Sequence, residues 1–166
     1  MKAKSKELYY VAGLASKWSG KHNSVGISTS LPEIEQRFIG IALSDFGIEP
    51  TKMTVEQGEN SVIVYFFHSR VAKLLKKTAD RRVMLAKNRE LAARYLAGLF
   101  DANGVVTGTR VVIRGLDKKD ELLLELVGIH SVNGSLLNIS DFIMLIKPYS
   151  SLLSLSHLPG NERDPR

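Results

Sequence analysis

One acidic residue stands out as a candidate for chemistry. Asp101 belongs to the segment Leu-Ala-Gly-Leu-Phe-Asp-Ala-Asn-Gly at residues 96–104, and a partial copy, Val-Ala-Gly-Leu-Ala-Ser at residues 11–16, lies 85 residues earlier. The copy has Ser16 where the later segment has Asp101. An acid at the C-terminal end of a helix is disfavoured by the helix dipole and is better tolerated beside a bound cation. Asp101 is therefore either a metal ligand or a solvated helix cap, whereas Ser16 is neutral.

Both copies also place an alanine beside a glycine, as Ala12-Gly13 and Ala97-Gly98. A glycine inside a helix costs about 1 kcal/mol relative to alanine, so its repetition indicates a packing requirement. Missing side chains let two helices approach more closely than the usual ~8–10 Å between axes. We expect the two helices to pack together at the centre of a pseudo-twofold molecule. Two unrelated buried helices are the alternative.

Two more matches occur in the same order and indicate a duplicated chain. Phe-Gly-Ile at 46–48 resembles Val-Gly-Ile at 127–129, and residues 61–75 match a segment that ends at 150–153. Apolar spacing, with Asn88 as an N-cap and Gly104 as a helix stop, predicts helices at residues 5–16, 32–46, 70–80, 88–102, 118–127 and 149–157. The predicted strands are residues 24–30, 52–56, 61–67, 110–114, 135–139 and 142–146. We expect repeats at 1–83 and 84–157, joined by a linker at 82–87, and a disordered tail at 158–166.

The charge of the chain favours a polyanionic partner. The net charge is +6 over 166 residues; residues 1–87 hold 14 Lys and Arg against 8 Asp and Glu, and residues 88–166 hold nine of each. A basic surface attracts nucleic acid because bound phosphates release counterions. Modest positive charge that only aids solubility is the alternative reading.

The composition also bears on the compartment. Cysteine is absent, which excludes disulfides and cysteine-bound zinc and points to the cytoplasm. No apolar run approaches the ~18 residues that span a membrane. The short apolar segment at residues 8–15 recurs as a repeat, so we interpret it as mature protein and not as a signal peptide.

Residues 96–104 resemble the signature of the LAGLIDADG homing endonucleases and differ from it at Phe100 and Asn103. The resemblance implies an α+β fold, a pseudo-twofold pair of αββαββα-like repeats. Each repeat has a curved antiparallel sheet with helices on one side, and the two motif helices, with Ala12, Gly13, Ala97 and Gly98, pack at the centre.

The same resemblance implies Mg²⁺-dependent cleavage of DNA, with an acid from each motif helix binding metal near the scissile phosphates. Asp101 would be one such acid. Ser16 replaces the other, and Lys17 and Trp18 replace Ala102 and Asn103. By resemblance, Lys147 is a second catalytic candidate, as a lysine at the end of the last strand; an exposed strand-end lysine is the alternative.

The family reads DNA with its sheets, so alternation along each strand decides which side chains reach the groove. Arg110 and Arg114 share a face with Val112, while Val111 and Ile113 share the other. The remaining candidates for nucleic-acid contact are Ser28, Ser30, Lys52, Lys118 and Lys119. Basic residues 73, 76, 77, 81 and 82 lie on or after a helix and either bind phosphate or form a solvated helix face.

Three functions remain open. The first is a homing-endonuclease-like protein that binds double-stranded DNA with at most one complete catalytic half, so that cleavage is impaired or limited to one strand. The second is an inactive module that binds DNA or structured RNA, such as an intron maturase or a regulator. The third is a protein-interaction domain, favoured by a predicted hairpin at 135–146 that is apolar on both faces. We expect a monomer without a membrane partner.

Overall fold

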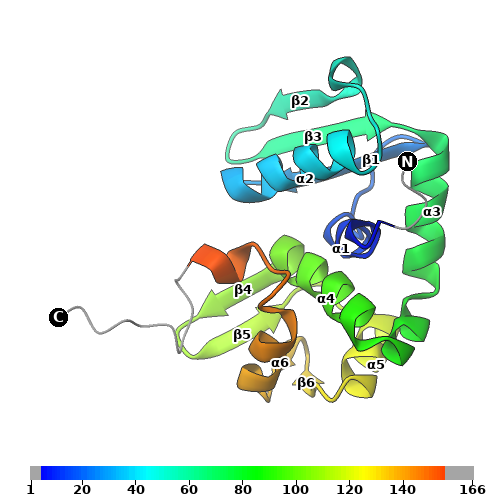
Figure 1. The fold of residues 1–166 in the computed structure, drawn as a ribbon. Helices are drawn as coiled ribbons and strands as arrows, with labels where there is room; N and C mark the ends of the chain where they lie inside the picture. Colours follow the sequence, from blue (N-terminus) through cyan, green and yellow to red (C-terminus); the bar gives the residue numbers. More distant parts are fainter. Residues whose placement is uncertain (1–4, 156–166) are drawn as a thin grey trace.

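Two helices lie against each other at the centre of the molecule (Figure 1). The structure is a computed structural model that describes residues 5–155. Helix α1 (Glu7–Leu14) packs along α4 (Arg89–Asn103). A Cβ added to Gly13 would lie 2.0 Å from the Tyr95 carbonyl oxygen, and one added to Gly98 would lie 2.0 Å from the Tyr10 carbonyl oxygen. Only glycine allows this contact, because any other side chain would overlap the backbone of the opposite helix.

The first part of the chain builds a three-stranded sheet. Its elements after α1 are β1 (Ser24–Thr29), α2 (Pro32–Ser44), η1 (Pro50–Lys52), β2 (Thr54–Gln57), β3 (Val62–Phe67) and α3 (Ser69–Asp80). The antiparallel strands lie in the order β1-β3-β2. Val25 pairs with Phe66 and Ile27 with Val64, and all four side chains are buried toward the core. Helix α2 covers this inner face (Figure 1).

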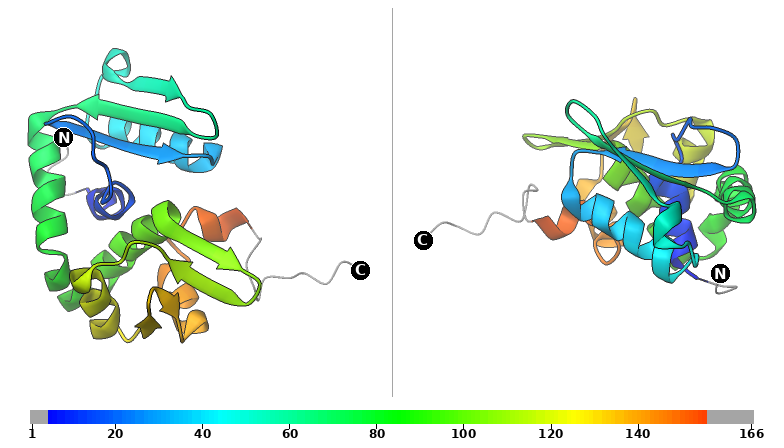
Figure 2. Two further views of the ribbon diagram at one scale, coloured as in Figure 1. Left: turned by 180° about the vertical axis from the view of Figure 1, so that it is seen from behind. Right: turned by 90° about the horizontal axis from the view of Figure 1, so that it is seen from above.

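The second part has one strand more. After η2 (Arg82–Lys87) and α4 follow β4 (Gly104–Thr107), β5 (Arg110–Ile113), α5 (Lys118–Leu126), β6 (Ser131–Val132), β7 (Ser135–Leu136), α6 (Ile139–Ile146) and η3 (Leu152–Leu155). The strands form an antiparallel sheet in the order β4-β5-β7-β6. Both sheets turn to the same side of the molecule, with α2 and α6 beneath them (Figure 2). The expected α+β class is confirmed, and the second part has the expected αββαββα order while the first part lacks one strand.

The helix ends follow the sequence signals. The side chain of Asn88 accepts a hydrogen bond from the Leu91 backbone N–H, and Gly104 ends α4 in an extended conformation. Gly47 and Gly128 follow α2 and α5 with φ of 68° and 88°. These left-handed conformations favour glycine. The two Gly-Ile matches therefore have the same local geometry.

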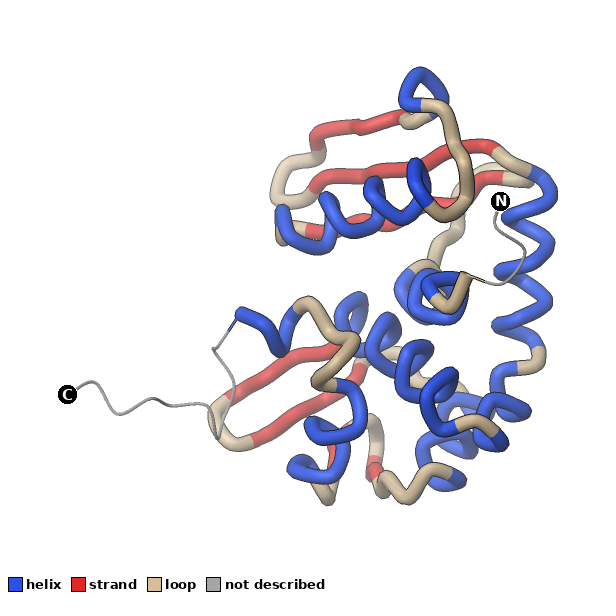
Figure 3. The backbone as a smooth tube through the Cα atoms, in the orientation of Figure 1, coloured by secondary structure: helices blue, strands red, loops and turns tan. Residues whose placement is uncertain are grey.

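The structure differs from several expectations about the second part. Residues 142–146 belong to helix α6 and not to a strand (Figure 3). Phe142, Leu145 and Ile146 are buried and Met144 is exposed, which is helical spacing; a short apolar run does not distinguish strand from helix. The apolar hairpin, with the protein-binding edge it would offer, is thus absent from the described residues.

The start and the end of the repeat also differ from the expectation, and so does the third sequence match. The sequence pattern does not predict strand β4, because its short run of residues directly follows α4. Residues 149–151 are not helical, and the short 3₁₀ helix η3 begins at Leu152; residues 156–166, including the expected tail, lie outside the described part. Residues 72–75 lie within α3 whereas 150–153 follow α6, so the third sequence match pairs elements that are not equivalent. Within residues 5–155, no helix combines the length and apolar character needed to cross a membrane.

Candidate nucleic-acid interface

Asp101 is the hub of a buried hydrogen-bond network. Its side chain is on the last full turn of α4 and only 6% exposed. Oδ2 accepts hydrogen bonds from Tyr10 Oη and the Ser151 backbone N–H, both at 2.7 Å. Oδ1 accepts from Ser150 Oγ at 2.5 Å and from the Leu152 backbone N–H at 3.3 Å. The carboxylate therefore ties α1, α4 and the turn after α6 together.

This network engages the carboxylate that is expected to bind a metal. Both oxygens are occupied by donors of the chain itself, and Mg²⁺ needs about six oxygen ligands in open octahedral geometry. Ser16, at the matching position two residues after α1, has a buried Oγ that finds no hydrogen-bond partner among the described residues. Residues 5–155 also contain no group of three or more His, Cys, Asp or Glu that would hold a metal. The donors at the ends of the motif helices do not fit a divalent ion.

The ends of the two motif helices carry a cation in place of a pair of acids. Lys17 follows α1 and is exposed, and a Cβ added to Gly115 would lie 3.4 Å from Lys17 Cε. Asn103 ends α4, with Nδ2 donating to the Leu99 carbonyl at 3.4 Å. A lysine suits the negative end of a helix dipole. Lys17 therefore supplies positive charge at this end of the helix pair, where the resemblance implies a second acid.

Arg110, in β5, and Arg114, directly after it, lie as alternation predicts. Val111 and Ile113 are each 1% exposed, and Arg110 and Arg114 are exposed on the opposite side of the strand. Neither guanidinium forms an ion pair within the described residues. Two unpaired guanidinium groups on one sheet face are available for phosphates or guanine edges.

The candidates in the first part lie less regularly. Ser28 is exposed on the outer face of β1, where its Oγ donates to Ser61 Oγ at 3.2 Å, and Ser30 is exposed just beyond the strand. Lys52 is the last residue of η1, and β2 begins two residues later at Thr54. The predicted strand at 52–56 therefore starts too early, and Lys52 lies outside the alternating face.

Three lysines lie on helices. Lys118 and Lys119 open α5, and Lys119 Nζ donates to the Asp80 carbonyl at 3.0 Å. Lys147 is the C-cap of α6 and not a strand-end residue, so the expected comparison with the family's strand-end lysine is wrong. A cation at this position is explained by the helix dipole.

The basic cluster at 73–82 is divided between two environments. Arg82 is buried, with Nε donating to Asp120 Oδ1 at 2.6 Å and a second ion pair to Asp117, the N-cap of α5. Burial opposes ionisation of Asp117, but the Asp120 backbone N–H and the Arg82 guanidinium lower the pKa of Asp117 to about 2. Arg82 therefore holds α5 in place and is not a phosphate ligand.

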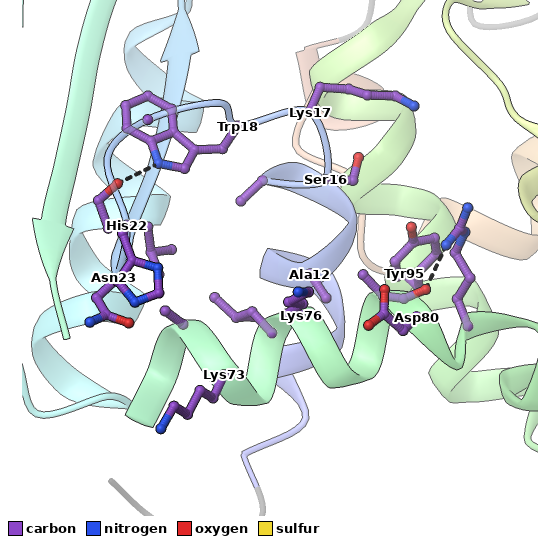
Figure 4. A pocket seen from close by; sticks show the side chains of 18 of the residues that line it. Ala12, Ser16, Lys17, Trp18, His22, Asn23, Lys73, Lys76, Asp80 and Tyr95 are labelled. Atoms are coloured by element: carbon purple, nitrogen blue, oxygen red, sulfur yellow. Dashed lines mark hydrogen bonds between the residues drawn. The ribbon is translucent and has the colours of Figure 1, made fainter. Parts of the chain in front are cut away.

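Lys73 and Lys76 of this cluster border a hollow of about 600 Å³ between α1, α3 and the loop after α1. Figure 4 shows Trp18 and His22 on one side of it and Tyr95 on the other. Burial, and then the charge of Asp120, raise the pKa of Tyr95, so its phenol stays protonated. No sequence pattern indicates this hollow, because its lining residues are scattered from Ala12 to Asp120.

The class of fold defined by this architecture is that of the homing endonucleases. A structure of mesophilic variants of the homing endonuclease I-DmoI superposes with a TM-score of 0.66 and 16% identity over 90% of this chain and 96% of that chain. The I-DmoI complex with DNA and Mn has a TM-score of 0.65 at 14% identity, covering 88% of this chain and 97% of that one. An I-DmoI variant solved with its target DNA and Mg gives 0.66 at 13% identity over 86% and 96%. At these identities the likeness shows the fold alone.

Sequence comparison adds one curated relative. A subunit of the A-type ATP synthase of Methanopyrus kandleri is 32% identical over 135 residues, which cover 76% of this chain and 13% of that protein. The chain thus corresponds to about an eighth of the length of this relative. No family model matches the chain.

Proposed function

We propose that the chain is a double-stranded-DNA-binding protein with the homing-endonuclease fold, and that it does not cleave DNA efficiently. One observation supports the absence of efficient cleavage. Asp101 is the only acid of the two motif copies, and its two carboxylate oxygens accept hydrogen bonds from four donors within the protein. A metal at this seam would have to break that network and would find no second carboxylate from Ser16. Impaired or single-strand cleavage is the most that such a site supports.

Binding rests on shape and charge. The two sheets open to one side, and the second presents Arg110 and Arg114 without ion pairs to described residues. Lys17 adds a cation between the sheets, beside the turn at Gly115. I-DmoI, which has the same fold, is described in complex with its target DNA and Mn or Mg. This chain differs from I-DmoI in that the side chains at the ends of its motif helices fit a divalent metal ion poorly.

The relative in Methanopyrus kandleri supports the interpretation that a segment like this chain is inserted into a longer protein. The fold covers 90% of this chain, yet the alignment occupies 13% of a protein named for another activity. We infer that the shared segment is a homing-endonuclease-like unit within that protein. In this chain we place its two repeats at 1–83 and 84–157.

The test is binding and cleavage of a supercoiled DNA library by purified protein, with EDTA, Mg²⁺ or Mn²⁺. We expect salt-sensitive binding in all three conditions and no specific double-strand breaks. Specific double-strand breaks in Mg²⁺ would overturn the loss of cleavage, and nicks in one strand would show that a single active half persists. Failure to bind DNA at low salt would refute the proposal as a whole.

A further inference from the structure

Three aromatic side chains lie together on the outer face of the first sheet. The rings of Trp18 and Tyr65 have centroids 5.8 Å apart and planes 28° apart, and Phe67 meets Tyr65 edge-on at 5.8 Å. Phe67 remains 50% exposed. The inner face of the same strands is filled by Val64 and Phe66, so these three rings are not needed by the core. This aromatic surface, of which Phe67 is the exposed edge, is therefore available for binding.

The backbone beneath the indole is shaped to receive it. A Cβ added to Gly26 would lie 2.8 Å from the ring atoms of Trp18, so the glycine lets the indole lie on the sheet. Trp18 Nε1 donates to Ser24 Oγ at 3.0 Å. The polar edge of the ring is therefore satisfied within the protein, and its remaining contacts are those of an aromatic surface.

Polar groups surround the rings. The three rings line a hollow of about 360 Å³ together with Lys21, Ser24 and Glu56. Glu56 Oε1 accepts the hydrogen bond of Tyr65 Oη at 2.9 Å, and a carboxylate has further lone pairs to offer. The hollow is within the size range of small-ligand sites, and it combines aromatic surface with an acceptor at its rim.

The loop between α1 and β1 adds positive charge. Lys17 and Lys21 flank Trp18, both are exposed, and neither forms an ion pair within the described residues. Lys17 lies beside Gly115, the residue that follows Arg114 in the chain. The aromatic group is thus joined to the cations of the proposed DNA surface.

We propose that this hollow binds an unpaired nucleobase of a nucleic acid whose neighbouring duplex lies across the two sheets. The inference rests on the proposed function, and it identifies an unpaired base as the part of the nucleic acid that the protein recognises beside the two sheets. Stacking on aromatic rings is the general means of holding an unpaired base, whatever its identity. The Glu56 carboxylate accepts a hydrogen bond from an exocyclic amino group, and Lys17 and Lys21 contact the adjoining phosphates. A protein partner is disfavoured because two lysines and a carboxylate would have to be desolvated with the rings.

Intrinsic fluorescence tests the proposal directly, because Trp18 is the only tryptophan of the chain. The probes are a fully paired duplex and the same duplex with a central bulge of unpaired adenines, each made as DNA and as RNA. We expect the bulged probe to bind between about fivefold and a hundredfold more tightly and to quench the Trp18 emission more strongly. The DNA and RNA arms show which backbone is preferred.

Variants separate the hollow from the rest of the surface. Phe67→Ala should remove most of the preference for the bulge while leaving binding of the paired duplex unchanged. Met144→Ala, which truncates a side chain that is 73% exposed on α6, is the matched control and should alter neither. Equal affinity for both probes with unchanged fluorescence would overturn the inference and leave the rings to a protein partner. If the unaltered protein binds neither the bulged probe nor the paired duplex, the proposed function itself is refuted.

Discussion

Tyr10 Oη donates a 2.7 Å hydrogen bond to Asp101 Oδ2 across the interface between α1 and α4. The Arg37 guanidinium lies over the Tyr10 ring, 3.5 Å from its centroid, and Arg37 also donates to Ser151 Oγ at 2.9 Å. Burial, and then the charge of Asp101, raise the pKa of Tyr10, which keeps the phenol a donor. Asp101 therefore has a structural role: its carboxylate accepts hydrogen bonds that hold α1 and α4 together, and Arg37 lies nearby.

Replacing this acid should destabilise the protein even without metal. Asp101→Asn puts an amide N–H₂ among donors and leaves a buried group unsatisfied, so we expect a loss of about 2–4 kcal/mol in the free energy of unfolding. Urea denaturation in EDTA measures it. Asp80→Asn, at an exposed position of α3, is the control and should change stability little. An unaltered Asp101→Asn midpoint would indicate a carboxylate reserved for metal.

The glycines of the motif helices should tolerate no side chain. Gly13→Ala or Gly98→Ala brings a Cβ to 2.0 Å from a carbonyl oxygen, which forces the helices apart and should cost about 3 kcal/mol or more. Gly40, in α2, is the control because a Cβ there would meet nothing within 4 Å. Gly40→Ala should stabilise by up to about 1 kcal/mol through helix propensity. Thermal unfolding distinguishes the three variants, and equal shifts would refute the close helix contact.

The sequence predicted the parts of this fold that depend on local rules. The Ala-Gly pairs, the Asn88 cap, the glycine stops and the alternation of Arg110 with Val111 all act within a few residues, and each appears in the structure. What could not be predicted depends on distant contacts. Asp101 is a hub only because residues 150–152 return to it, and the tertiary packing of α6 decides that 142–146 is helical. The aromatic group likewise unites Trp18 with residues 65 and 67 of β3, and the indole meets them only because β1 pairs with β3 and brings Gly26 opposite Tyr65.

The two arginines at the ends of β5, Arg110 and Arg114, should contribute to DNA affinity through phosphates. Arg110→Ala and Arg114→Ala should each weaken binding of paired DNA and reduce the slope of log affinity against log salt by about 1. Fluorescence anisotropy over a salt series measures both quantities. Lys147→Ala, at the C-cap of α6 beneath the sheets, should leave the slope unchanged. A larger effect from Lys147 than from either arginine would place the DNA on another face.

The Arg82–Asp117 pair should make stability depend on acid pH. The folded pKa of Asp117 is about 2 against an ordinary 3.8, so its contribution is present above the ordinary value and is lost as the pH falls toward 2. The Asp117 side chain is 53% exposed, and solvent screening limits this contribution to about 1 kcal/mol. Asp117→Asn keeps a good N-cap but cannot titrate, so the wild-type urea midpoint should fall more steeply between pH 4 and 2 than that of the variant. Parallel curves would show that Arg82 derives its support from Asp120 alone.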